Sequence, residues 1–186
     1  MRKPFLFSIL CVALAVFVSC KPSDDPTDDP TTNIMKYDGN TYNISGAYLE
    51  DGTVTYHGGD IETLDLVLYA NVSSKQYKLT LECVFLENEG ISGDYKHLFN
   101  LWEQAEEAGV THFLEEMFTS FNISNIMDFD GESIFFKNAN VKIKDKGNNN
   151  CEVTFKLVCE NGKTLEGNYS GKVSSSMWGI LEMQRK

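Results

Sequence analysis

The chain has 186 residues and a formal net charge of −11 at pH 7. Hydrophobic residues make up 42% of it and aromatic residues 12%, a composition that excludes a wholly disordered chain. The excess of acidic residues argues against nucleic acid or anionic lipid headgroups as partners, because like charges repel. We therefore expect a folded protein that does not bind nucleic acid.

The first nineteen residues have the layout of a secretory signal peptide. Arg2 and Lys3 give a positively charged start, and the stretch from Phe5 to Val18 is apolar except for Ser8. A helix that crosses a bilayer needs about 20 apolar residues, so this stretch is too short to be a membrane span. We expect residues 1–19 to be removed by cleavage.

A cysteine stands directly after this segment, in the stretch Phe17-Val18-Ser19-Cys20. The stretch resembles the lipobox of bacterial lipoproteins, in which the cysteine receives a diacylglyceryl group and becomes the first residue of the mature chain. This resemblance implies that Cys20 is the site of lipidation. Several acyl chains such as palmitate, at about 0.8 kcal/mol per buried methylene, would hold the protein firmly to a lipid bilayer.

Residues 20–33 are rich in proline and aspartate and poor in apolar side chains, which predicts an extended tether. The acidic cluster soon after Cys20 is similar to the export signal of Bacteroidetes lipoproteins. That similarity implies attachment to the outer membrane with the protein facing the cell exterior. The alternative is an ordinary signal peptide followed by an unrelated cysteine and an acidic linker.

The remaining residues, 34–186, are predicted to form one β-rich domain. Cleavage after residue 19 removes two of the 16 basic residues and none of the 27 acidic ones, so the formal charge becomes −13. Short alternating segments and turn residues indicate strands; the predicted strands are 34–37, 41–44, 61–71, 77–85, 134–144, 152–160, 164–173 and 177–183. Asp38-Gly39 and Asn161-Gly162 predict tight hairpins, the second of type I′.

A different periodicity follows Gly90. Apolar residues fall at helical spacings of three and four in two runs, separated by Gly109 as a helix stop. The first run begins near Asn100, which with Glu103 could form a capping pair, and Thr111 could cap the second. These patterns predict a helical insertion at residues 96–121 that covers one end or edge of the sheet.

Eight or nine strands in meander order suit either an antiparallel barrel or a two-layer sandwich. The stretch from Gly162 to Gly171, with Tyr169 between Gly167 and Gly171, makes the domain similar to small lipocalin-like β-barrel lipoproteins of Bacteroidetes, most of which have no assigned function. In a strand, glycines on one face indicate a sharp bend or an aromatic ring lying over the backbone.

Three cysteines remain in the mature domain besides Cys20: Cys83, Cys151 and Cys159. Cys151 and Cys159 are eight residues apart on one predicted strand, roughly 26 Å at about 3.3 Å per residue, too far for a disulfide. The sequence leaves two alternatives: three buried thiols in the core, or one disulfide between Cys83 and either of the others.

No motif in the sequence predicts catalysis, a cofactor or a metal. Ser170 lacks the glycine and the following helix of a nucleophile elbow, so we interpret it as a strand serine. His57, His97 and His112 are scattered, although His112 would share a helix face with Glu115 and Glu116. Closely spaced carboxylates at residues 128–132 resemble part of a calcium loop, but a turn is the simpler interpretation; the stretch is Asp128-Phe129-Asp130-Gly131-Glu132.

Two functions from different classes remain. The first is a surface-anchored binding or adhesion module for a glycan, a small apolar ligand or a protein, in which outward-facing tyrosines could stack on sugars; the candidates are Tyr42, Tyr48, Tyr56 and Tyr69. Packing of these rings in the core is the alternative for each. The second function is a hydrolase of cell-surface or extracellular polysaccharide, which would need paired carboxylates in a cleft.

Overall fold

A computed structural model describes residues 32–52, 60–126 and 131–175. The predicted strand 177–183 and the whole of residues 1–31 lie outside these ranges. No helix among the described residues has the length and apolarity needed to cross a membrane.

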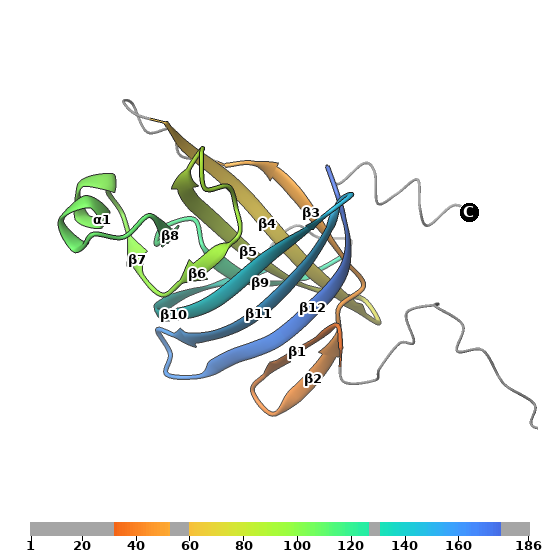
Figure 1. The fold of residues 1–186 in the computed structure, drawn as a ribbon. Helices are drawn as coiled ribbons and strands as arrows, with labels where there is room; N and C mark the ends of the chain where they lie inside the picture. The colour runs from red at the N-terminus through yellow and green to blue at the C-terminus, as the bar shows by residue number, and fades with distance from the viewer. Residues whose placement is uncertain (1–31, 53–59, 127–130, 176–186) are drawn as a thin grey trace, which may run out of the picture.

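Seven strands form a closed barrel (Figure 1). In chain order they are β3 (Gly46–Asp51), β4 (Ile61–Val72), β5 (Lys75–Leu86), β9 (Ser120–Asn125), β10 (Gly131–Gly147), β11 (Asn150–Cys159) and β12 (Thr164–Ser174). Each pairs antiparallel with the next, as the meander prediction required. The barrel, and not the sandwich, is the observed architecture.

The closing pair of the barrel is parallel. β12 lies beside β3 through only two register pairs, Val173 with Ala47 and Ser174 with Tyr48. An odd number of strands in up-and-down order leaves the first and last strands pointing the same way, so the closing pair must be parallel. The sheet is therefore mixed, which corrects the prediction of a purely antiparallel barrel.

Alternation along the strands fills the barrel with apolar side chains. On β4 the inward residues are Leu66, Leu68 and Ala70, all at most 1% exposed. Large side chains from the other strands complete the core; the largest fully buried ones include Phe85, Tyr95, Phe121, Phe136 and Leu157. These side chains form one continuous core cluster inside the described part of the barrel.

Several shorter elements pair with the edges of the seven barrel strands. β1 (Ile34–Tyr37) and β2 (Asn40–Asn43) form a hairpin paired to β12, with Asp38 and Gly39 at positive φ in its turn, as predicted from Asp-Gly. β6 (Gly93–Tyr95) pairs with β10, and β7 (Leu98–Phe99) with β8 (His112–Glu115), which pairs with β5. These pieces fill the wall where β5 and β10 extend beyond β9.

The helical insertion at 96–121 is only partly confirmed. α1 (Trp102–Ala108) forms, and Gly109 ends it in the left-handed conformation, with its N–H directed to the carbonyls of Ala105 and Glu106. Its N-cap is Leu101 with no side-chain cap, so the proposed pairing of Asn100 with Glu103 is wrong. The second helix, with Thr111 as its cap, is also wrong, because residues 112–115 form β8 and residues 120–125 form β9.

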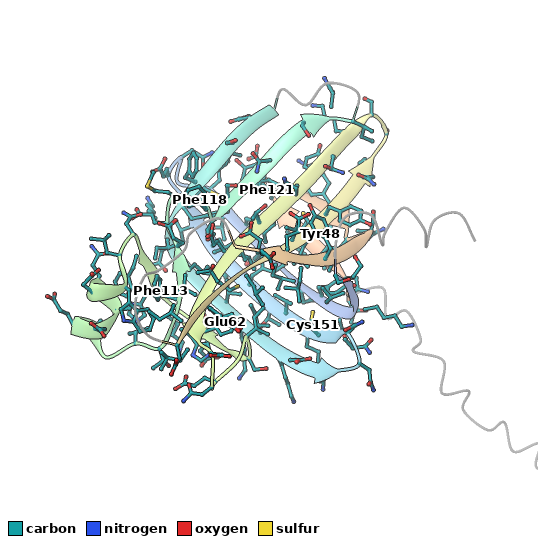
Figure 2. All side chains as sticks on the ribbon, turned by 90° about the horizontal axis from the view of Figure 1, so that it is seen from above. Tyr48, Glu62, Phe113, Phe118, Phe121 and Cys151 are labelled. Carbon is teal, nitrogen blue, oxygen red and sulfur yellow. The ribbon has the colours of Figure 1, made fainter. Side chains whose placement is uncertain are left out.

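Burial on both faces explains this error. In β8, Leu114 packs into the barrel core, while Phe113 packs outward with Val84 and Ala105 (Figure 2). A short strand buried on both sides has consecutive apolar residues, and periodicity alone cannot separate it from a helix. The type I′ turn predicted at Asn161-Gly162 is also wrong, because only Gly162 has a positive φ and the loop between β11 and β12 has four residues, 160–163.

Candidate functional site

The two ends of the barrel differ. The closed end carries the β1–β2 hairpin, the β4–β5 turn and the loop 160–163. The open end carries the β10–β11 hairpin and the last residues of β3 and β12. In Figure 1 the β1–β2 hairpin lies at the bottom of the molecule. The candidate site is at the open end.

Stacked aromatic rings seal the closed end. Tyr42 of β2 stacks on Tyr77 of β5 with ring centroids 4.0 Å apart, and Phe121 of β9 contacts Tyr37 of β1 at 5.1 Å. β1 can lie close to β12 because Gly167 has no side chain; a Cβ there would collide with the carbonyl oxygen of Ile34 and with the ring of Phe155. The aromatic ring expected over this glycine is therefore present.

Polar contacts fasten the same hairpin to the loop 160–163. Asn161 donates its amide to the Tyr37 hydroxyl at 3.0 Å, and the Lys163 ammonium lies 2.7 Å from an Asp38 carboxylate oxygen. The Lys163 ammonium also lies 5.5 Å from the centre of the Tyr37 ring. The closed end is thus held by the packing of its aromatic rings and by the polar contacts between the β1–β2 hairpin and the loop 160–163.

At the open end there is a cavity of ≈ 190 Å³. Its floor consists of apolar side chains from five barrel strands and one connecting segment; they are Leu49, Leu66, Ile91, Ile143, Cys151 and Val173. Its rim is polar and comes from the β10–β11 hairpin: Asp145, Gly147, Asn148, Asn149 and Asn150. A larger open hollow of ≈ 460 Å³ adjoins it and shares Leu49, Asn149 and Val173.

The cavity forms where the short pairing between β3 and β12 ends. After Tyr48 the described part of β3 no longer pairs with β12, so the wall parts between Leu49 and the end of β12. The neighbouring hollow is lined on the β3 side by Leu49, Glu50 and Asp51. The open end therefore offers apolar surface at depth and carboxylates at its edge.

Hydrogen bonds fix the rim. The β10–β11 turn has positive φ at Asn148 and Asn149, and the Asn149 carbonyl accepts a bond from the backbone N–H of Val173 at 2.7 Å. The Asp145 carboxylate accepts the N–H of Gly147 at 2.8 Å, and the backbone N–H of Asp145 donates to the Ser92 hydroxyl at 2.8 Å. The amide and carboxylate groups of the rim are thus held before any ligand arrives.

Ile91 reaches the cavity because two side chains hold its segment. The Tyr95 hydroxyl donates to the Ile91 carbonyl at 2.8 Å, and His112 places Nε2 3.0 Å from the Gly90 carbonyl oxygen. His112 also places Nδ1 3.3 Å from a Glu89 oxygen. His112 therefore supports the wall of the cavity and does not belong to a metal-binding helix face with Glu115 and Glu116.

Cys151 contributes a thiol, a potential nucleophile, to the lining of the open-end cavity. Burial, together with the carboxylates of Asp145 and Glu152, raises the pKa of this thiol to about 11. At neutral pH it stays protonated, and a protonated thiol is a poor nucleophile. The cavity is suited to non-covalent binding and not to thiol catalysis.

The other predicted positions have structural roles or lie outside the described residues. Ser170 is an exposed strand residue whose N–H donates to Asn33, as the strand interpretation expected. Cys83, Cys151 and Cys159 are all free and buried, so the alternative of a Cys83 disulfide is wrong. His97 stacks on Phe99. His57, Tyr56, Cys20 and the carboxylates of residues 128 and 130 lie outside the described ranges.

The three candidate tyrosines within the described ranges do not present free rings. Tyr48 and Tyr69 are buried together with Val67, and Tyr42 stacks on Tyr77. No group of three or more His, Cys, Asp or Glu side chains in the described ranges is placed to hold a metal ion. The cavity itself was not predicted, since its floor joins single residues from distant strands.

A row of carboxylates crosses the outer wall near the open end. Asp65 of β4 lies between Glu50 of β3 and Glu82 of β5 in register. Burial, and then the charge of Glu50, raise the pKa of Asp65 to about 6, although Lys78 opposes the shift. Burial likewise raises the pKa of Glu115 on β8.

Comparisons with protein-family models, with curated proteins and with solved structures found no match to this chain. The functional argument therefore rests on the residues and on their geometry.

Proposed function

We propose that this protein is a lipoprotein on the outer face of an outer membrane, and that its barrel is a binding module whose site is the open-end cavity. The observation that carries the binding proposal is the difference between the two ends. Aromatic rings fill the barrel interior at the closed end, where two hollows of ≈ 310 and ≈ 350 Å³ are lined mainly by exposed residues, whereas the open end keeps a cavity with a largely buried apolar floor. Small-molecule sites are typically concave, mostly apolar and supplied with a few fixed polar groups.

The cavity limits the size and chemistry of the ligand. An engineered cavity of about 150 Å³ in another protein binds benzene, so ≈ 190 Å³ suits a single ring or a short acyl chain. Apart from the Cys151 thiol its floor is aliphatic, and no aromatic ring lines it among the described residues, which disfavours sugar stacking. The rim carboxylate and amides favour a ligand with a hydroxyl or amine at its outer end, so we propose a small, partly apolar molecule with one polar end.

A pair of tryptophan variants tests the site. Leu49→Trp would fill the mouth of the cavity, while Val72→Trp adds the same ring to an exposed position of β4 at the closed end. A library of small ring and acyl compounds is screened by NMR against the chain from Lys21 onward. We expect ligands whose binding is lost in Leu49→Trp and kept in Val72→Trp. Binding unchanged by Leu49→Trp, or confined to oligosaccharides, contradicts the proposal.

The proposals of lipidation and of surface display rest on the sequence of residues 1–33. The predicted tether ends where the fold starts, because β1 begins at Ile34. In a bacterium that processes lipoproteins, we expect the mature protein to begin at an acylated Cys20, as measured by mass spectrometry. Cys20→Ala should give a protein that is not acylated and does not sediment with membranes. For surface display, external protease should remove the domain from intact cells; protection until lysis would exclude that part of the proposal.

A further inference from the structure

A patch of exposed apolar side chains lies beside α1. Leu101 at the start of α1 is 55% exposed, and Met117 and Phe118 in the turn after β8 are 64% and 38% exposed. The parallel β7–β8 register places Phe99 beside Glu115, and the N–H of Glu116 donates to the Phe99 carbonyl, so residue 101 follows close to residue 117. We call α1 with residues 115–118 the apolar tip. Exposed apolar side chains that gather in this way indicate an interaction surface.

The turn that carries Met117 and Phe118 is fixed. The Glu115 side chain, 2% exposed, accepts the N–H groups of Met117 at 2.7 Å and Phe118 at 3.0 Å with one carboxylate oxygen. Asn100 donates its amide to Glu116 at 2.8 Å, which fastens the turn to the start of α1. A partner would therefore meet apolar groups that need little further ordering, and this lowers the cost of binding.

The chain segment that forms the tip is acidic. No lysine or arginine occurs between Lys96 and Lys137. Glu103 lies in the first turn of α1, and the last turn of the helix carries no basic residue although its carbonyl end favours a cation. Glu106 and Glu107 stand near that end and are exposed. Glu106 and Glu107 thus place negative charge at the end of the helix where it is unfavourable, and a bound cation would relieve it.

We propose that the apolar tip docks a cationic amphipathic segment of a partner protein or peptide. Apolar side chains of that segment would cover Leu101, Met117 and Phe118, and its lysines or arginines would face the glutamates of α1. Complementary charge selects the partner and speeds encounter, while the apolar contacts slow dissociation. This surface is separate from the open-end cavity, and the proposal does not depend on a ligand there.

A designed peptide tests the docking surface. The probe is a helical peptide of about 18 residues with leucines at spacings of three and four and lysines elsewhere; its control carries glutamate in place of lysine. Binding to the chain from Lys21 onward is measured by calorimetry at low and high salt. The test variant is Met117→Ser with Phe118→Ser, and the matched control is Val72→Ser with Ile126→Ser, which removes two exposed apolar side chains at the closed end.

We expect the lysine peptide to bind, the glutamate peptide not to bind, and high salt to weaken the complex. The Met117/Phe118 variant should bind roughly tenfold more weakly with unchanged thermal stability, and the control variant should match the original protein. Equal binding by the Met117/Phe118 variant, binding of both peptides, or absence of binding overturns the proposal. Self-association through the tip in sedimentation, or binding to lipid vesicles instead of the peptide, overturns it as well.

Discussion

The two ends of the barrel are built from different chemistry. At the closed end, rings from four strands, β1, β2, β5 and β9, pack on one another, and the loop 160–163 is tied to the β1–β2 hairpin. At the open end, aliphatic side chains stop short of filling the space, and asparagines and carboxylates surround it. The difference teaches that one barrel can be filled with packed rings at one end and leave a cavity at the other.

The largest expected effect is at the closed end. Phe121 is fully buried and contacts the rings of Tyr37 and Tyr77. Phe121→Ala should lower the free energy of unfolding by about 3–5 kcal/mol, because it leaves a cavity among packed rings. Leu49→Ala, at the half-buried mouth of the open end, should cost only about 1 kcal/mol. Denaturant unfolding measures both; similar losses would show that the two ends are packed alike.

A smaller effect concerns pH and belongs to the wall at the open end. The folded-state pKa of Asp65 is raised to about 6 from the ordinary value of 3.8. The folded state therefore binds this proton more tightly than the unfolded state does, and the cost of the charge is present above pH 6 and relieved as pH falls through 6. Stability should rise by about 1 kcal/mol from pH 8 to pH 5.5.

Asp65→Asn isolates this contribution. The variant should be more stable than the original protein at pH 8 and should lose most of the pH dependence between pH 5.5 and 8, measured by denaturant unfolding at each pH. The change removes the charge and keeps the size of the side chain. An Asp65→Asn variant that kept the original pH dependence would assign the effect to another group, such as Glu115, whose pKa is also raised by burial.

The smallest expected effect is in the rim. Asn149 holds a positive φ of 59°, and glycine is favoured at the second position of a type I′ turn. Asn149→Gly should therefore raise the unfolding free energy by about 0.5 kcal/mol, measured by thermal unfolding, and should keep the backbone bond to Val173. Asn140→Gly, in the middle of β10, should lower stability instead. A loss of stability in Asn149→Gly would show that the asparagine side chain braces the rim.

Much of the fold could be predicted from the sequence. Alternation in residues 61–71 and 77–85 predicted β4 and β5, and Asp38-Gly39 and Gly109 marked a hairpin and a helix end correctly. Local patterns succeed where one face is buried and the other is exposed. They failed for β8, because Phe113 and Leu114 are both buried on opposite faces.

The cavity could not be predicted from the sequence, because it depends on the register between β3 and β12. Leu49, Ile143 and Val173 belong to strands that are far apart in sequence, and each looks like an ordinary core residue. Only the two-pair contact of β12 with β3 leaves space between them. The closing pair is parallel because the number of barrel strands is odd. That number could not be counted from the sequence, because the run from residue 110 to 121 was assigned to a helix although it contains β8 and the start of β9.

The reactivity of the three thiols tests the difference between the ends most directly. In the chain from Lys21 onward, Cys151 lines the open-end cavity, while Cys159 at the closed end and Cys83 in the core are fully buried. We predict that a small neutral alkylating agent labels Cys151 first, slowly because its pKa is raised to about 11, and that Leu49→Trp slows this labelling further. Mass spectrometry of native protein locates the label. Labelling of Cys159 as fast as that of Cys151 would contradict a sealed end and an open one.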